Sequence, residues 1–240
     1  MEKVLEEISV HTMNPLHRRG PVFYASLPCT TMNKEETKRH LVSVLWDRLA
    51  TIGSPLWTFP DSSNRTAFPI HLARDPLGKP ALLLGAHQGP AISFSECGGK
   101  VWAALCWDES DVGIDATEAV EFQGKYPFQS VFHAQEIQHV LRLAGGELRE
   151  AAALIWSAKE AVVKALGCAF HFVDPLEIHV HPPIEEDSGY TFPVFLSGKA
   201  LARFPIAEQA LWVHSVSQGK MWLSIAVLQR LPVEGSCSTS

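Results

Sequence analysis

Two charged segments of the chain carry residue types that could do chemistry together. The first, VGIDATEAVEF (residues 112–122), reads as a strand that presents Asp115. The second, IWSAKEAVVKALG (residues 155–167), places Glu160 and Lys164 in an otherwise apolar helical pattern. Two carboxylates from different elements can coordinate a hard cation such as Mg²⁺, and lysines neutralise phosphate charge. These residues therefore predict a site that holds a diphosphate through a metal ion.

A structural alternative exists for the same charges. Lys159 falls on the apolar face of the helical segment, four residues after Ile155. A lysine there must run its stem out to solvent or meet an anion, because an unpaired buried ammonium is costly. In the alternative, Glu160 and Lys164 form a surface pair worth about 0.3–0.5 kcal/mol, and Lys159 reaches solvent. The helical segment alone leaves both interpretations open.

The surrounding pattern predicts the elements that position these residues. An amphipathic helix is expected over residues 34–50, with Asn33 as its N-cap. Short apolar runs separated by tight turns then predict an antiparallel meander that ends in VGIDATEAVEF. A helix-rich section follows, FHAQEIQHVLRLAGG and LREAAALIWSAKEAVVKALG, and after it four strands, LEIHVHPP, YTFPVFLSG, QALWVHSVSQ and KMWLSIAVLQ.

The expected fold class is therefore α+β, built from two α+β units that meet near residues 108–112. The expected organisation is an N-terminal subdomain over residues 1–110, a C-terminal subdomain over 111–231, and a disordered tail over 232–240.

Composition excludes several classes of protein. Twenty basic and 26 acidic residues give a net charge of -6, which argues against a broad nucleic-acid surface. Five cysteines without CxxC spacing indicate neither a disulfide framework nor a zinc ribbon. The start of the chain does not read as a secretion signal, and no apolar run approaches the ~20 residues of a membrane helix. We expect a soluble protein of the cytoplasm.

The two charged segments together resemble a known signature. VGID followed by WSAKEAVVK is similar, at every named position, to the paired motif G-[IV]-D and [FW]-[SCT]-x-K-E-[SA]-x-x-K of the 4'-phosphopantetheinyl transferases. The upstream segments RDPLGKPAL and AISFSE resemble the GKP segment and the N-[IVL]-S-H-S strand of the same family. The chain length resembles the pseudo-dimeric Sfp-type enzymes, in which two similar subdomains related by a pseudo-twofold enclose the active site at their interface.

The resemblance implies an enzyme, a monomer, that moves the phosphopantetheine arm of coenzyme A onto a serine of an apo acyl, polyketide or peptidyl carrier protein. Adenosine 3',5'-bisphosphate is released and Mg²⁺ is required. The resemblance implies that Asp115 and Glu160 bind Mg²⁺ and that Glu160 is also the base. It implies that Lys164 is a catalytic residue that contacts a phosphate of coenzyme A, with Lys159 close to the same site, and that Trp156 forms a wall of the pocket. Further contacts to coenzyme A are implied for Lys79, Ser93 and Arg39.

Two positions depart from the family pattern. The usual acid two residues after the aspartate is replaced by Thr117, and the acid is Glu118 instead. Since successive strand residues point to opposite faces, either Thr117 supplies a hydroxyl or holds a metal-bound water, or the strand bulges and Glu118 swings in. We expect the hydroxyl of Thr117. The second departure is Phe94, which replaces a phosphate-binding histidine and can neither donate a hydrogen bond nor carry charge.

Two other functions remain open from the sequence. Phe94 and Thr117 favour a relative that binds coenzyme A or a carrier protein but has lost catalysis, whereas the intact charges at Asp115, Glu160 and Lys164 argue against it. An unrelated Mg²⁺-dependent phosphohydrolase is the third hypothesis.

Overall fold

A computed structural model describes residues 8–15, 20–29, 33–53, 70–75, 78–85, 87–205 and 211–229. The predicted tail at 232–240 lies outside the described residues. Among the helices in these ranges, none is both long enough and apolar enough to cross a membrane.

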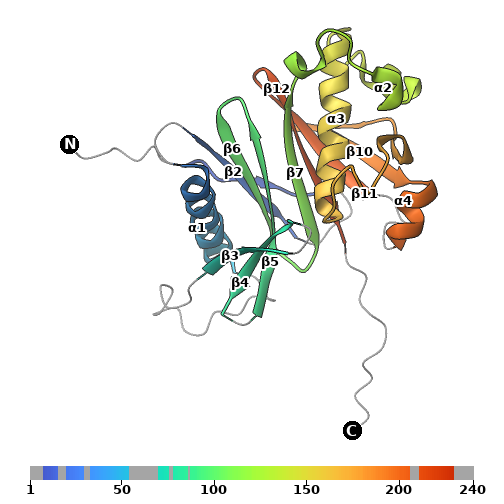
Figure 1. Ribbon diagram of the computed structural model, residues 1–240. Coiled ribbons are helices and arrows are strands. Elements are labelled where there is room, and N and C mark those ends of the chain that lie inside the picture. Colours follow the sequence, from blue (N-terminus) through green and yellow to red (C-terminus); the bar gives the residue numbers. More distant parts are fainter. Residues whose placement is uncertain are drawn as a thin grey trace.

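The N-terminal half of the chain forms one antiparallel sheet with a helix against it (Figure 1). Its strand order is β1-β2-β6-β5-β4-β3. Helix α1 packs against β2 and β6. The elements are β1 (His11–Met13), β2 (Val22–Pro28), α1 (Lys34–Ile52), β3 (Ile70–Arg74), β4 (Pro80–Leu84), β5 (His87–Cys97) and β6 (Lys100–Cys106).

The C-terminal half forms a second antiparallel sheet, in the order β7-β12-β11-β10-β8, with β9 paired to β10. Helix α3 packs against β7 and β12. The strands are β7 (Asp111–Glu118), β8 (Ile178–Val180), β9 (Ile184–Glu186), β10 (Gly189–Leu196), β11 (Leu211–Gln218) and β12 (Met221–Leu228). The α-helices are α2 (Ala134–Val140), α3 (Leu148–Ala165) and α4 (Gly198–Arg203), and short 3₁₀ helices span Ala119–Phe122, Phe128–Ser130 and Pro175–Glu177.

The two halves share one topology. In each, a first strand (β2 or β7) leads through loops and a long helix (α1 or α3) to a meander whose last strand (β6 or β12) returns to pair with the first. The predicted α+β fold with two similar subdomains is confirmed by this correspondence.

Local signals explain why α1 forms where it does. Asn33 accepts a hydrogen bond from the backbone of Glu36, whose side chain accepts one from the backbone of Asn33 in return. Leu41, Leu45 and Leu49 recur every fourth residue and are fully buried. The helix therefore presents one apolar stripe to the N-terminal sheet.

A glycine brings α3 unusually close to β7. A Cβ added at Gly113 would lie 1.9 Å from the carbonyl oxygen of Ala161 and 2.5 Å from the amide nitrogen of Ala165. Only glycine lets the helix backbone lie against the strand at this point. This contact places the charged residues of α3 beside the next residues of β7.

An apolar layer joins the two subdomains. Side chains from β2 and β6 pack with Ile114 and Ala116 of β7 and with alternate residues of β12. Along β7, Ile114 and Ala116 therefore face the other subdomain, while Gly113 faces α3. This alternation turns Asp115 to the α3 side as well.

Candidate active site

Asp115 is the centre of a buried polar cluster. Its Oδ1 accepts a hydrogen bond from Ser95 Oγ of β5 at 2.9 Å and forms an ion pair with Lys164 Nζ of α3 at 2.6 Å. Its Oδ2 accepts a hydrogen bond from Thr117 Oγ1 at 2.7 Å. Lys164 also donates to the backbone oxygen of Ile114 at 3.2 Å. One carboxylate thus ties together both subdomains and the α3 helix.

Glu160 lies one helical turn before Lys164 and is mostly buried. Its pKa is raised to about 7: burial is the largest cause, Asp115 and then Glu121 raise it as well, and Lys164 lowers it. The carboxylates of Asp115 and Glu160 therefore repel one another in a partly desolvated place. A carboxyl group with this pKa is suited to gain or lose a proton near neutral pH.

Glu121 is a site residue that the sequence analysis missed. It lies in the 3₁₀ helix Ala119–Phe122, directly after β7, at the exposed edge of the acidic cluster. Its pKa is raised by partial burial, and also by Asp115 and Glu118. The signal available in the sequence was only an acid just beyond the end of a strand, which is common.

The strand around Thr117 is regular. Residues Asp111 to Glu118 of β7 pair one by one with β12, without a bulge. Thr117 therefore stays on the face of Asp115, and its hydroxyl is directed to that carboxylate. Of the two alternatives left by the sequence, the structure rules out the bulge; a contact of Thr117 with metal stays a prediction.

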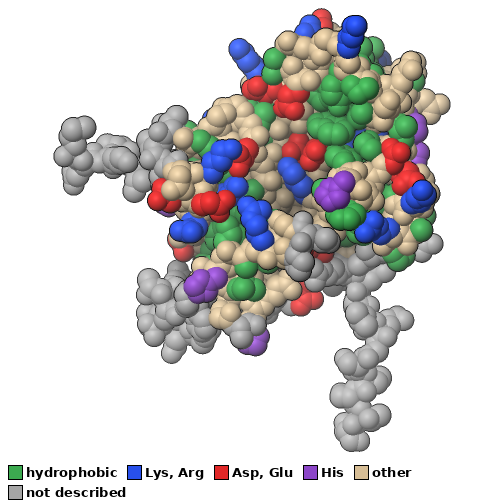
Figure 2. Space-filling model, in the orientation of Figure 1, with side chains coloured by type: hydrophobic (Ala, Val, Ile, Leu, Met, Phe, Trp, Pro, Cys, Tyr) green, Lys and Arg blue, Asp and Glu red, His purple; other side chains and the backbone are tan. Residues whose placement is uncertain are grey.

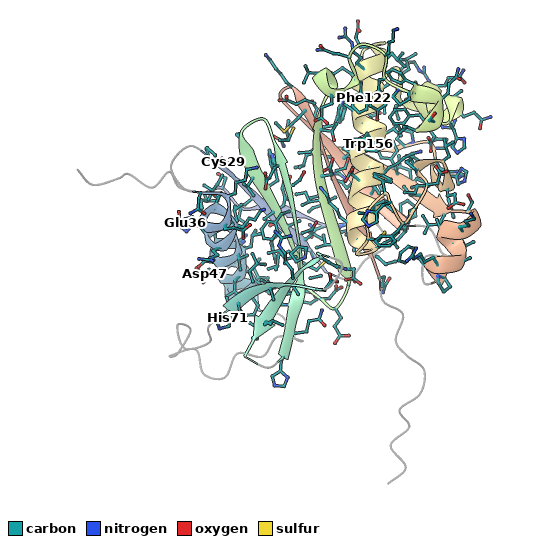
Figure 3. The ribbon with its side chains drawn as sticks, in the orientation of Figure 1. Cys29, Glu36, Asp47, His71, Phe122 and Trp156 are labelled. Carbon is teal, nitrogen blue, oxygen red and sulfur yellow. The ribbon has the colours of Figure 1, made fainter. Side chains whose placement is uncertain are left out.

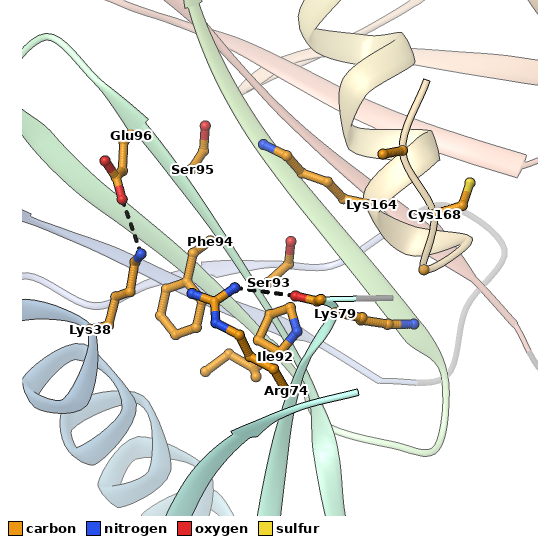
Figure 4. Close-up of a pocket in the computed structure, with 14 residues that line it drawn as sticks. Lys38, Arg74, Lys79, Ile92, Ser93, Phe94, Ser95, Glu96, Lys164 and Cys168 are labelled. Carbon is orange, nitrogen blue, oxygen red and sulfur yellow. Dashed lines mark hydrogen bonds and ion pairs between the residues drawn. The ribbon is translucent and has the colours of Figure 1, made fainter. Parts of the chain in front are cut away.

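A pocket of about 420 Å³ opens beside this cluster, between the subdomains (Figure 4). On the same face, basic and acidic side chains gather between the two halves (Figure 2). Four cations and one carboxylate line the pocket, with an aromatic ring between them. The lining residues are Lys38, Arg74, Gly78, Lys79, Pro80, Ile92, Ser93, Phe94, Ser95, Glu96, Lys164, Gly167, Cys168 and Ala169.

Three predicted coenzyme A contacts lie together in this pocket: Lys79, Ser93 and Lys164. Lys79 Nζ forms an ion pair with Asp111 Oδ1 at 2.6 Å and donates to the backbone oxygen of Ala165 at 3.2 Å. It therefore connects the N-terminal subdomain to the start of β7 and the end of α3.

Two serine hydroxyls of β5 cap the free edge of β7. Ser93 Oγ accepts a hydrogen bond from the amide of Ile114, and Ser95 Oγ accepts one from the amide of Ala116, both at 3.1 Å. An edge strand otherwise exposes such amides to solvent or to other chains. The serines thus hold the wall of the pocket against the strand that carries Asp115.

The structure does not bring Lys159 to this pocket, which corrects the expectation that it lies close to the site of Lys164. Lys159 is fully buried, with Nζ 2.8 Å from Glu136 Oε2, and it donates to the backbone oxygens of Val131 and Pro175. Burial lowers its pKa, while Glu136 raises it. The anion that a lysine on the apolar face requires is therefore an internal glutamate.

Arg39 is also outside the pocket. It is exposed on α1, while Lys38, the preceding residue, turns inward and lines the cavity. Neighbours on a helix point about 100° apart, so only one of them can face the pocket. Lys38 is therefore the cation of α1 to be considered in place of Arg39.

Trp156 does not line the pocket either. It stacks on Phe170, with ring centroids 4.7 Å apart, and packs against the C-terminal core cluster to which Phe122 also belongs (Figure 3).

Phe94 lies in the pocket wall with a cation over it. Lys38 Nζ is 5.9 Å from the centroid of the Phe94 ring and 3.0 Å from Glu96 Oε1. A positive charge is thus present near the position where the family pattern has histidine, but it is shared with a carboxylate.

The donor set suits a magnesium ion in part. Mg²⁺ is usually held by one or two carboxylates together with substrate phosphates and water. Asp115 and Glu160 supply two carboxylates; the pKa of Glu160 is raised mainly by burial and then by Asp115, and a divalent cation would favour its ionised form. Within the described ranges, no group of three or more His, Cys, Asp or Glu residues is arranged to hold a metal. For a bound Mg²⁺, phosphate and water oxygens would complete the coordination.

Residues 111–211 match the sequence model of a family described as the 4'-phosphopantetheinyl transferase superfamily. The match begins at the first residue of β7 and includes Asp115, Glu160 and Lys164, so the resemblance of the VGID and WSAKEAVVK segments to this family is confirmed. The upstream segments RDPLGKPAL and AISFSE lie outside the match, and their resemblance stays a prediction. The match says nothing about the Sfp-type subtype, which stays a prediction.

Two solved structures are also similar to part of the chain. The ACPS-CoA complex of Chronobacterium ammoniagenes is 22% identical with a TM-score of 0.43, over 52% of this chain and 99% of that chain. A Chronobacterium apo-ACPS structure is 23% identical with a TM-score of 0.41, over 50% of this chain and 98% of that chain. None of the curated proteins matches the chain.

Proposed function

We propose that this protein is an Sfp-type 4'-phosphopantetheinyl transferase. It moves phosphopantetheine from coenzyme A to a serine of an apo carrier protein and releases adenosine 3',5'-bisphosphate. The observation that carries the proposal is a pocket lined by four cations that joins, at Lys164, an acidic pair formed by Asp115 and Glu160. A polyanion with a diphosphate fits such a pocket, and the match of residues 111–211 to the superfamily supports coenzyme A as that polyanion.

The residues of the site can account for each bond and proton in the transfer. The serine Oγ forms a bond to the phosphorus that bears the pantetheine arm, and the bond from that phosphorus to the bridging oxygen breaks. The electron pair leaves with adenosine 3',5'-bisphosphate, and the serine proton passes to Glu160. A carboxylate with a pKa of about 7 is matched to that task near neutral pH.

The other charges orient the reactants and neutralise charge. Lys164 is held by Asp115 at the mouth of the pocket and Lys79 by Asp111, so both ammonium groups stay in place before substrate binds. Such preorganised charge contributes much of the catalysis in phosphoryl transfer. Mg²⁺, held by Asp115 and Glu160, would supply further neutralisation of the diphosphate.

Transfer is tested by incubating the protein with coenzyme A, Mg²⁺ and apo acyl, polyketide and peptidyl carrier proteins. A mass gain of one phosphopantetheine on the carrier serine is expected, and Glu160→Ala should abolish it without unfolding the protein. Binding of coenzyme A with no transfer to any carrier would instead support the catalytically impaired relative that Phe94 favours. Release of phosphate without a carrier would support a phosphohydrolase. A monomeric state and a cytoplasmic location belong to the same proposal.

A further inference from the structure

The two ends of the pocket differ in how their cations are paired (Figure 4). At one end, Lys79 and Lys164 are paired with Asp111 and Asp115, which are buried behind them and are not among the lining residues. An incoming phosphate there meets ammonium groups first. This end also adjoins Glu160, so under the proposed function it takes the diphosphate.

At the other end, the paired carboxylate stands in the pocket wall itself. Glu96 lines the pocket and forms ion pairs with Lys38, at 3.0 Å, and with Lys34. Lys34 and Lys38 hold the pKa of Glu96 below its ordinary value, so it is ionised at neutral pH. A phosphate that approaches Lys38 therefore also approaches a negative charge.

The remaining cation at this end is also partly neutralised. Arg74 lies 3.7 Å from Glu35 and donates a hydrogen bond to the backbone oxygen of Gly78. The neighbouring wall is the ring of Phe94, which offers an apolar face and no hydrogen bond. This end is better suited to an uncharged planar or sugar group than to a second phosphate.

We infer that Glu96 is a specificity-determining residue that weakens the binding of a phosphate on the ribose of the nucleotide. The inference rests on the proposed function: if the diphosphate occupies the Lys164 end, the ribose end of the substrate lies toward Lys38 and Glu96. The protein then uses coenzyme A and its 3'-dephospho form with similar efficiency. Glu96 itself takes no part in the chemical step.

The kinetic test compares kcat/KM for coenzyme A and for 3'-dephospho-coenzyme A, with one apo carrier protein. Glu96→Gln keeps the shape of the side chain and removes its charge. It should shift the ratio of the two kcat/KM values toward coenzyme A by about tenfold, chiefly through a lower KM for coenzyme A. Glu185→Gln, an exposed acid on β9, removes the same charge elsewhere and should leave the ratio unchanged.

A second measurement needs no carrier protein. Calorimetric binding of adenosine 3',5'-bisphosphate should tighten in Glu96→Gln, while binding of adenosine 5'-monophosphate should change little. If Glu96→Gln does not fold, Glu96→Ala serves in both measurements.

The outcomes separate the inference from the proposed function. Transfer with an unchanged ratio in Glu96→Gln overturns the inference and leaves the proposed function standing. Weaker binding of both nucleotides also overturns it, because Glu96 would then serve only to position Lys38. No transfer by the wild type, together with the expected change in nucleotide binding, overturns the proposed function and supports the assignment of Glu96. Binding of neither nucleotide overturns both.

Discussion

Lys164 of α3 and Asp115 of β7 form an ion pair beside the close approach of the helix to Gly113, with Nζ 2.6 Å from Oδ1. Asp115 has further partners in Ser95 and Thr117, whereas Lys164 is the one of the two that lines the pocket. The buried acid therefore fixes the position of a lysine that is free to meet a ligand on its other side.

Replacing Lys164 should remove transfer and cost some stability. Lys164→Met leaves the buried Asp115 without its cation, so we expect kcat/KM to fall by about 100-fold or more and the free energy of unfolding to fall by about 1–3 kcal/mol. Steady-state kinetics and urea unfolding measure the two effects. Lys199→Met, an exposed lysine on α4, is the matched control. An active Lys164→Met would contradict the proposed role.

Glu160 should make the protein less stable at alkaline pH. Folding raises its pKa from 4.5 to about 7, so the folded state binds the proton more tightly than the unfolded state. Stability is then lost as the pH rises between these two values, and the loss is complete above about 7. Glu160→Gln should therefore raise the free energy of unfolding at pH 8 by about 1–3 kcal/mol in Mg²⁺-free buffer, while it abolishes transfer.

Two controls accompany the Glu160 measurement. At pH 4 the wild type and Glu160→Gln should be equally stable, because the wild-type carboxyl is then protonated in both states. Mg²⁺ should raise the thermal midpoint of the wild type more than that of the variant. Equal free energies of unfolding for the wild type and Glu160→Gln at pH 8 would show that the ionised carboxylate of Glu160 does not destabilise the folded protein.

Lys159 should matter for folding and not for coenzyme A. Lys159→Met leaves Glu136 buried and uncompensated, which should cost about 3–5 kcal/mol. Adding Glu136→Gln should recover part of that loss, as unfolding of the single and double variants will show. The KM for coenzyme A of the folded Lys159→Met fraction should equal that of the wild type. A large rise in this KM would support the contact between Lys159 and coenzyme A that the family resemblance implies.

Gly113 should tolerate no side chain. A methyl group there would lie 1.9 Å from the carbonyl oxygen of Ala161, so Gly113→Ala must push α3 away from β7. We expect a loss of more than about 2 kcal/mol and loss of activity even at temperatures where the variant is folded. Gly89→Ala, where the nearest atom would be 3.2 Å away, should be milder.

Local patterns in the sequence predicted most elements, but the meander expected to end in VGIDATEAVEF is wrong in its last step, because β7 pairs with β12 of the second sheet and not with β6. The N-cap at Asn33 and the apolar spacing behind it marked α1, and the VGID run became β7. The expected helix FHAQEIQHVLRLAGG is shorter than its pattern: α2 ends at Val140, and turns follow up to the positive-φ pair Gly145 and Gly146. A run of apolar residues did not specify where the helical hydrogen bonds stop.

The partners of charged residues could not be predicted in the same way. Glu136 meets Lys159, and Glu96 meets Lys38, only because separate elements fold together. The choice between Lys38 and Arg39 depended on the rotation of α1 against its sheet, which is a tertiary property. Motif spacing identified the acidic centre, whereas the charges that surround the ligand had to come from the fold.

The serine caps on β7 give the pocket a built-in reporter. The amides of Ile114 and Ala116 are bonded to side-chain hydroxyls of the opposite subdomain, and Ser93 and Ser95, which carry those hydroxyls, also line the ligand pocket. Each opening of the seam between the subdomains must release these two amides to solvent. Their rate of hydrogen–deuterium exchange therefore measures how often the two halves part, and a ligand that bridges them should slow both amides together.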